Sequence, residues 1–209
     1  MTIPVTRRRE NTRARLLDAA AQVFAEIGLE GASVEAICER AGFTRGAFYS
    51  NFESKDQLFL ALASSVAEQR LSSVRGRIDE FVASGVLAGD ADPTALVQRI
   101  MDSGLDDRLG VLMMSEIRIR ALRDEGFAKA YREQDRAMVT SIEDIIQGLI
   151  DTGLFALRID VPSAARMLMV QWEGCMARAA LDGLDGESLH HVGAEALGQL
   201  VDLIIAPTE

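Results

Sequence analysis

Residues 33 to 55, SVEAICERAGFTRGAFYSNFESK, decide the fold of this chain. Val34 and Ile37 recur at the spacing of one buried helical face, so the stretch begins with a predicted helix. Ser33 carries the side-chain oxygen that caps the start of such a helix, and Gly42 supplies the backbone freedom for a sharp exit. The stretch therefore opens with a short helix that ends in a tight turn.

A second short helix, residues 45–49, is predicted directly after the turn. Thr44 can cap its start, and Ser54 with Gln57 matches the capping-box pattern S-x-x-Q, which opens a longer third helix. Two short helices across a glycine-containing turn predict a helix-turn-helix. In that motif the second helix is the recognition helix, whose N-terminal residues face base edges in the major groove of DNA.

The distribution of charge is compatible with DNA binding, although the chain carries a formal net charge of −10. Residues 1–55 contain eight Lys or Arg and seven Asp or Glu. Residues 56–209 contain fourteen Lys or Arg and twenty-five Asp or Glu. The first 15 residues contain five Arg and one Glu. A basic start can therefore face phosphates while an acidic body faces away. The alternative is that the Arg-rich start is only a solvated tail.

Helical periodicity continues over the rest of the chain. Residues 1–10 read as a flexible arm, and a helix is predicted from Thr12 to Gly28. A long helix, or two with a bend near Gly76, follows from Ser54. Further helices are predicted at residues 93–103, 107–123, 126–151, 160–182 and 188–205. The fold class is all-α, with about nine helices: an arm and a three-helix helix-turn-helix domain over residues 1–55, and a helical domain over residues 56–209.

The sequence lacks the motifs that are typical of several classes of protein. No stretch approaches the ~20 apolar residues of a membrane span and no signal-peptide pattern occurs, which favours a cytoplasmic protein without a membrane partner. Cys38 and Cys175 lie in apolar helical patterns and predict buried free thiols. His190 and His191 are interpreted as surface residues. Without a catalytic constellation, a metal-ligand spacing or a phosphate loop, the sequence predicts no enzyme, cofactor or metal site.

Four motifs occur in a fixed order: AAAQVFAEIG at residues 19–28, SVEAICERAG at 33–42, FTRGAFYSNF at 43–52 and SKDQL at 54–58. Together they make residues 12–62 resemble the DNA-binding domain of the tetracycline-repressor (TetR) family of bacterial regulators. Two departures occur, since Ala47 stands where a hydroxyl residue is common and Asn51 where His is frequent. The resemblance implies a homodimer, a palindromic operator and a C-terminal cavity for a ligand that weakens DNA binding. Most proteins of the family are repressors.

Candidate DNA contacts lie in the helix-turn-helix and in the basic N-terminus. The guanidinium of Arg45 can bridge O6 and N7 of guanine, and a contact to phosphate alone or a solvated Arg are the alternatives. Gly46 lacks a side chain where the protein backbone and DNA come closest. Lys55 and the positive N-terminal end of its helix can together bind a phosphate, and the alternative is a solvated Lys. The candidate contacts are Ser33, Thr44, Arg45, Gly46, Tyr49, Lys55, Arg8 and Arg9.

A second candidate site is apolar and rich in methionine, which adapts to varied ligands. Its candidate residues are Met113, Met114, Glu116, Phe127, Met138, Met169, Trp172 and Met176. They predict a small apolar or amphipathic organic ligand, with a plain hydrophobic core as the alternative for each residue.

The last two helices carry enough apolar residues for an intermolecular four-helix bundle about a two-fold axis. The candidate interface residues are Leu168, Cys175, Ala179, Val192, Ala196, Leu200 and Ile204. The alternative is that these helices cover their own domain.

These features predict a ligand-responsive repressor that binds double-stranded DNA as a homodimer. Adjacent major-groove sites lie ~34–36 Å apart, and a ligand that prefers a wrongly spaced dimer would release the DNA. An activator or architectural DNA-binding protein without a small-molecule ligand is the alternative. An all-helical enzyme or carrier is a third possibility, which the missing catalytic set disfavours.

Overall fold

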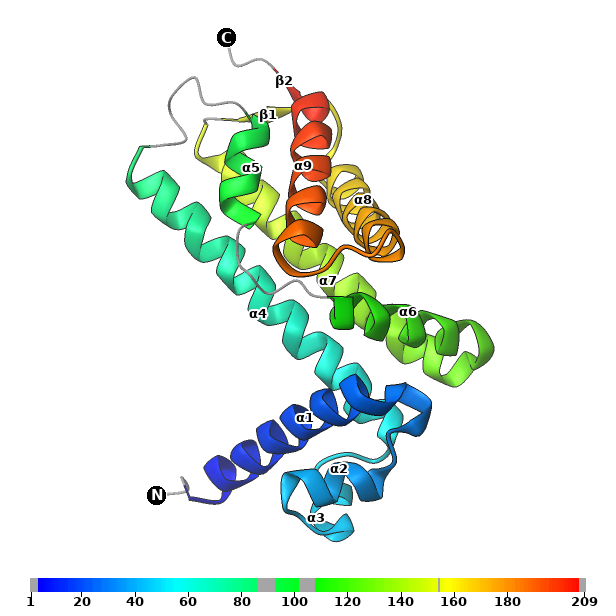
Figure 1. Cartoon of the computed structure of the whole chain (residues 1–209). Coiled ribbons are helices and arrows are strands. Elements are labelled where there is room, and N and C mark those ends of the chain that lie inside the picture. Colours follow the sequence, from blue (N-terminus) through cyan, green and yellow to red (C-terminus); the bar gives the residue numbers. More distant parts are fainter. Residues whose placement is uncertain (1–3, 86–92, 102–107, 154, 207–209) are drawn as a thin grey trace. The chain divides into compact units, whose positions relative to one another are not determined.

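A computed structural model describes residues 4–85, 93–101, 108–153 and 155–206. Over these residues the regular structure consists of nine α-helices and one pair of two-residue strands, which confirms the predicted all-α class (Figure 1). None of the described helices combines the length and the apolar character that a bilayer span requires.

The chain divides into two compact units, and the N-terminal unit is discontinuous in sequence. It consists of Met1–Val66 together with Met113–Tyr131, and the C-terminal unit consists of Ala67–Leu112 and Arg132–Glu209. This division differs from the predicted one after residue 55, because a segment from the middle of the chain packs with the N-terminal helices. Three helices, α4 (Lys55–Ala83), α6 (Arg108–Arg123) and α7 (Glu125–Asp151), contribute residues to both units.

The N-terminal unit contains α1 (Pro4–Gly31), α2 (Val34–Ala41), α3 (Arg45–Tyr49) and parts of α4, α6 and α7. Its core is built from large aromatic and aliphatic side chains, and the rings of Phe24 and Phe59 meet edge to face with centroids 6.2 Å apart. Burying such side chains is the main source of stability in a bundle this small. Its fully or nearly fully buried residues include Leu16, Phe24, Ile37, Phe48, Phe52, Leu58, Phe59 and Ile117.

The flexible arm predicted for residues 1–10 is wrong over residues 4–10, because α1 begins at Pro4, whereas residues 1–3 lie outside the described residues. Proline suits the first helical position, and residues 5–11 contain neither glycine nor proline to interrupt the helix. Two arginines also attach this helix to the helix-turn-helix. Arg9 Nη2 donates to the backbone carbonyl of Ser50 at 3.1 Å, and the Arg13 guanidinium lies 4.5 Å from the centre of the Phe52 ring.

The predicted stop of the first helix is confirmed in its geometry. Gly28 has φ 74° and ψ 172°, a non-helical conformation that favours glycine, and it interrupts the helical run before the last residues of α1. The turn that follows gives α2 a new direction. The long helix is a single one, since α4 runs through Gly76 to Ala83 without interruption.

The C-terminal unit is built around α9 (Gly186–Ile204), against which α5 (Pro93–Met101) and α8 (Val161–Leu181) pack (Figure 1). One cluster of buried residues joins α7, α8 and α9, and a second joins α8 and α9, with Val111 of α6 packed against it. A strand pair that the sequence did not predict, β1 (Ala156–Leu157) with β2 (Ile205–Ala206), lies beside α9. Two residues are too few to show strand alternation.

Candidate nucleic-acid interface

The helix-turn-helix is held by local caps that its own sequence supplies. Ser33 Oγ accepts the backbone N–H of Ala36 at 3.1 Å, and Thr44 Oγ1 accepts that of Ala47 at 3.2 Å. Gly42 lies between the helices with φ 70°, a left-handed conformation. Each hydroxyl still has a proton to donate. Ser33 and Thr44 can therefore cap their helices and donate to a phosphate at the same time.

Arg45 stands at the first residue of α3 with 62% of its side chain exposed. Its Nη1 lies 2.9 Å from Glu35 Oε1 of α2, and its guanidinium lies 6.0 Å from the centre of the Tyr49 ring. A hydrogen bond with Tyr49 and the charge of Glu35 raise the pKa of Arg45. The side chain is a permanent cation that is accessible to a partner and already oriented by two neighbours.

Gly46 has room for a side chain in the free protein. A Cβ at this position would have Thr44 Oγ1 as its nearest neighbour, at 3.7 Å, which is an ordinary contact. Packing inside the protein therefore does not require glycine at this position. Tyr49, one turn later, is half exposed and presents its hydroxyl on the same short helix.

The basic residues predicted to contact phosphates have different surroundings. Arg8 is exposed on α1, whereas Arg9 donates to Ser50 at the end of α3. The Lys55 ammonium is directed toward the protein, where Nζ donates to the backbone carbonyl of Leu29 at 3.0 Å in a partly buried contact. In this structure Lys55 connects the start of α4 with the end of α1.

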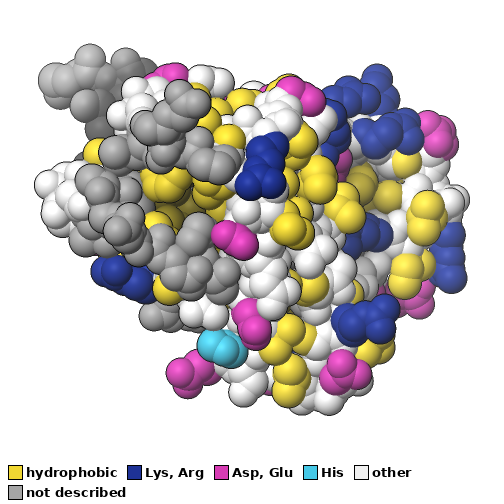
Figure 2. Space-filling model, turned by 90° about the horizontal axis from the view of Figure 1, so that it is seen from above, with side chains coloured by type: hydrophobic (Ala, Val, Ile, Leu, Met, Phe, Trp, Pro, Cys, Tyr) yellow, Lys and Arg dark blue, Asp and Glu magenta, His cyan; other side chains and the backbone are white. Residues whose placement is uncertain are grey.

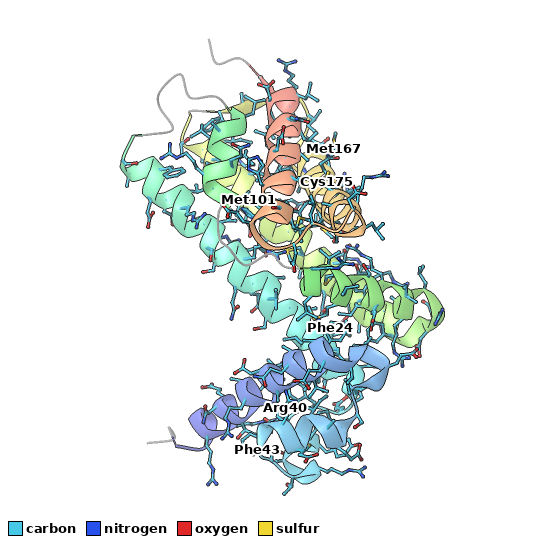
Figure 3. The ribbon with its side chains drawn as sticks, in the orientation of Figure 1. Phe24, Arg40, Phe43, Met101, Met167 and Cys175 are labelled. Carbon is cyan, nitrogen blue, oxygen red and sulfur yellow. The ribbon has the colours of Figure 1, made fainter. Side chains whose placement is uncertain are left out.

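Ion pairs and stacked cations that the sequence analysis missed fix the helix-turn-helix on α1. Arg40 forms two hydrogen bonds with Glu26, at 2.8 and 2.7 Å, and the bond lowers the pKa of the Glu26 carboxyl. Arg15 donates to the carbonyl of Ala41 and covers the Phe43 ring. Figure 3 labels Phe24, Arg40 and Phe43 in the N-terminal unit. Partners 14 to 26 residues apart have no local spacing that would reveal them.

The middle of the chain contributes a second set of contacts to the N-terminal unit. Glu116 Oε2 on α6 accepts the backbone N–H of Leu29 at 2.9 Å. One turn later, Arg120 Nη2 lies 2.6 Å from Asp56 Oδ2 on α4, and this bond raises the pKa of Arg120. Two charged residues of α6 are thus used to hold the ends of α1 and α4.

Comparison with known proteins decides the identity of this unit. The family model for the bacterial regulatory proteins of the tetR family matches residues 16–62, the span of the capped helix-turn-helix and its supporting helices. This unit is a TetR-family DNA-binding domain. Its helix-turn-helix is therefore the DNA-binding element of a transcriptional regulator, as the motifs predicted.

Two curated repressors are similar to this chain over most of its length. The nicotine-responsive transcriptional repressor HdnoR of Paenarthrobacter nicotinovorans is 27% identical over 83% of this chain and 86% of its own. The transcriptional repressor AcnR of Corynebacterium glutamicum is 26% identical over 93% of this chain and 90% of its own. A TetR transcription regulator from Haloarcula marismortui is similar in fold, with a TM-score of 0.66 at 18% identity over 94% of this chain and all of that one.

The predicted ligand contacts are divided between the two units. Met113, Met114, Glu116 and Phe127 belong to the N-terminal unit, whereas Met138, Met169, Trp172 and Met176 belong to the C-terminal unit. Met113 and Phe127 are buried, and the Glu116 carboxylate accepts a hydrogen bond from the Leu29 N–H. Apolar periodicity thus indicated burial without indicating which core each residue joins.

An aromatic cluster surrounds Trp172 on α8. The Trp172 ring meets His190 of α9 edge to face at 6.1 Å, and the Arg70 guanidinium lies 5.8 Å from its centre. The surface position predicted for His190 is wrong, because its side chain is buried among α8 and α9; His191 is exposed. Adjacent helical positions point about 100° apart, so one histidine faces the core and the next faces solvent.

Five of the seven predicted dimer residues take part in packing within the protomer. Ala179 and Ile204 are buried, and Leu168, Val192 and Leu200 pack against the two core clusters. Cys175 and Ala196 are half-buried, so the burial predicted for the Cys175 thiol is only partial, whereas Cys38 is buried and free. Burial raises the pKa of the Cys38 thiol.

Other apolar side chains of α8 and α9 are exposed instead. They are Met167, Val170, Leu181 and Leu203, with exposed fractions between 45% and 86%. Figure 3 labels Met167 and Cys175 on α8, and Figure 2 shows hydrophobic side chains gathered between charged ones on one face of the molecule. Gly193 brings α8 and α9 together within the protomer, since a Cβ there would lie 2.8 Å from Met176 Sδ and from a Trp172 ring atom.

Proposed function

We propose that this protein is a ligand-responsive transcriptional repressor of the cytoplasm, which binds a palindromic double-stranded operator as a homodimer. The observation that carries the proposal is the exposed, capped recognition helix α3 with Arg45 at its first turn. That position is the one from which a helix-turn-helix reads base edges.

In the proposed complex, Arg45 donates to guanine O6 and N7, and the hydroxyls of Ser33, Thr44 and Tyr49 donate to phosphates. Gly46 allows the backbone of α3 to approach the DNA, because no side chain projects there. Arg8 adds an exposed cation from α1. Phosphate contacts set the register on DNA, and the base contact selects the sequence.

The proposed homodimer uses α8 and α9. The exposed Met167, Val170, Leu181 and Leu203 support this assignment, because exposed apolar side chains on two neighbouring helices favour burial in an interface. A two-fold axis would place the same surface of each protomer against its copy. The half-buried Cys175 and Ala196 would lie at the edge of that interface.

The proposed ligand is a small apolar or amphipathic organic molecule bound in the C-terminal unit. Met138, Met169, Trp172 and Met176 are its candidate contacts, and a relative that responds to nicotine supports a ligand of this size. The Arg70 guanidinium over Trp172 offers a polar group beside the aromatic surface. A ligand acts only by its difference in affinity for the DNA-binding and non-binding states of the dimer.

The proposal is tested by selection of a randomised double-stranded DNA library with the purified full-length protein. Enrichment of one sequence with two-fold symmetry, bound with a stoichiometry of two chains, supports a homodimeric DNA-binding protein. Titration of the enriched duplex with a panel of small organic compounds then tests the response to ligand. Enrichment of no sequence would overturn the proposal, and enrichment without a response to any compound would favour an architectural or activating protein.

A further inference from the structure

An ion pair joins Glu35, in the first turn of α2, to Arg45, the first residue of α3, across the helix-turn-helix motif. The Oε1–Nη1 distance is 2.9 Å, and more than half of each side chain is exposed. Exposed ion pairs contribute little to stability. The two helices are already fixed by the Ser33 and Thr44 caps and by the buried Phe48. Stabilisation of the fold therefore does not explain why this ion pair is present.

The pair has a different consequence for Arg45. Its guanidinium is placed between a carboxylate on one helix and the Tyr49 ring on its own helix. A long side chain that is already oriented loses less conformational freedom when it binds. A bidentate bond to guanine has strict geometry, whereas attraction to a phosphate does not. Orienting the Arg45 side chain therefore strengthens its contact with guanine more than its contact with a DNA phosphate.

A carboxylate at this position also acts on DNA directly. Glu35 repels the phosphates of every sequence alike, because the phosphate backbone carries the same charge whatever the bases are. Its carboxylate also competes with phosphates for the Arg45 cation. Glu35 thus lowers the affinity for non-specific DNA. For the operator, the oriented contact of Arg45 with guanine offsets this loss of affinity.

We propose that Glu35 is a specificity-determining residue, which raises the discrimination between operator and other DNA by orienting Arg45 and by opposing phosphate-only binding. The proposal rests on the proposed function, in which α3 reads base edges. The repulsion is the same for every sequence, so Glu35 changes the discrimination only through Arg45 and is a positioning residue. It does not need to touch DNA itself.

The chain offers a matched control on the same helix. Glu39 lies one turn after Glu35 on α2 and is also exposed, but its electrostatic partner is Arg40. Glu35→Gln and Glu39→Gln remove the same charge from the same helix. Only the first removes the carboxylate that holds Arg45.

The experiment measures the affinity of each variant for the selected duplex and for a scrambled duplex by fluorescence anisotropy. For Glu35→Gln we expect tighter binding of the scrambled duplex and no gain on the selected one, so that the ratio of the two affinities falls roughly tenfold, within the range of one lost base contact. Glu39→Gln should leave the ratio unchanged. Adding Glu35→Gln to Arg45→Ala should not lower the ratio further.

An unchanged ratio in Glu35→Gln, or an equal rise in both affinities as for simple charge removal, would overturn the inference and leave the proposed function standing. A further fall of the ratio in the double variant would also overturn it, because Glu35 would then act without Arg45. A wild-type protein that binds neither duplex would overturn the proposed function, and the inference with it. A melting temperature equal to that of the wild type shows that each variant is folded.

Discussion

The carboxylate of Glu116 accepts a hydrogen bond from the backbone N–H of Leu29 at 2.9 Å, although 87 residues separate the two in sequence. On its other side, the Leu29 carbonyl accepts a bond from Lys55 Nζ at 3.0 Å. Leu29 follows Gly28, where α1 is interrupted. Both polar groups of one turn residue are thus satisfied by charged side chains from two other helices of the same unit.

Replacing Glu116 by alanine should destabilise the N-terminal unit by about 1–3 kcal/mol, because a partly buried backbone N–H loses a charged acceptor. Chemical denaturation followed by circular dichroism measures this loss. Glu116→Gln keeps an acceptor oxygen and should recover most of the stability. Equal stability of Glu116→Ala and the wild type would show that water replaces the carboxylate.

Replacing Lys55 by alanine separates two roles for its ammonium. A phosphate contact predicts weaker binding to every sequence and a salt dependence of log K smaller by about 0.9. An anchor for Leu29 predicts lower stability with an unchanged salt dependence. We expect the second result, since Nζ is already bonded within the protein. Titrations of one duplex at several salt concentrations, with a melting curve for each variant, measure both quantities.

Replacing Arg45 by alanine should relax the choice of sequence and weaken binding to the selected duplex by about 1–3 kcal/mol. The loss should be much smaller on a scrambled duplex, because the guanine contact is absent there. Anisotropy titrations against both duplexes measure the difference. An unchanged affinity for the selected duplex would mean that α3 is not the recognition helix.

Gly46→Ala should stabilise the free protein and weaken its binding to DNA. The free protein accommodates the added methyl group, whose nearest neighbour would be Thr44 Oγ1 at 3.7 Å, and alanine is favoured over glycine in helices by up to about 1 kcal/mol. A higher melting temperature together with a lower affinity supports close approach of α3 to DNA. A gain in stability without loss of affinity would contradict it.

Acid should weaken the attachment of α2 to α1 through Glu26. Its pKa is lowered in the folded protein by the hydrogen bond from Arg40, below an ordinary value of 4.5. A carboxyl with a lowered folded pKa contributes stability that is present above 4.5 and is lost as the pH falls through the folded pKa. Arg40→Met should therefore reduce the steepness of acid unfolding below that pH. Denaturation midpoints measured between neutral and acidic pH test this, with Glu39→Gln as the control.

The sequence predicted the parts of the fold that depend on neighbours along the chain. Ser33, Thr44 and Ser54 each bond to a backbone N–H three residues later, and this fixed spacing is visible in the sequence. The family motifs extend over the same local stretch. The reciprocal bond of the capping box differs by one position, because Gln57 accepts the N–H of Glu53 and not that of Ser54.

Contacts between distant residues were not predictable in the same way. The acidic side chain of Glu116 gave no sign that it would bond to Leu29, and Arg120 gave none that it would pair with Asp56. Apolar periodicity marked Met113 as buried but could not assign it to the N-terminal unit. Charge and hydropathy describe one side chain at a time, whereas these partners are selected by the tertiary fold.

The discontinuous N-terminal unit has a consequence for synthesis of the protein. Residues from Met113 to Tyr131 complete this unit, so the ribosome must produce roughly the first two thirds of the chain before its first domain can close. Until then the Leu29 N–H lacks its Glu116 acceptor, and the buried site of Ile117 is unfilled. A fragment that ends at Val66 should therefore be a poor substitute for the whole chain, and partial translation products should be good substrates for chaperones and proteases.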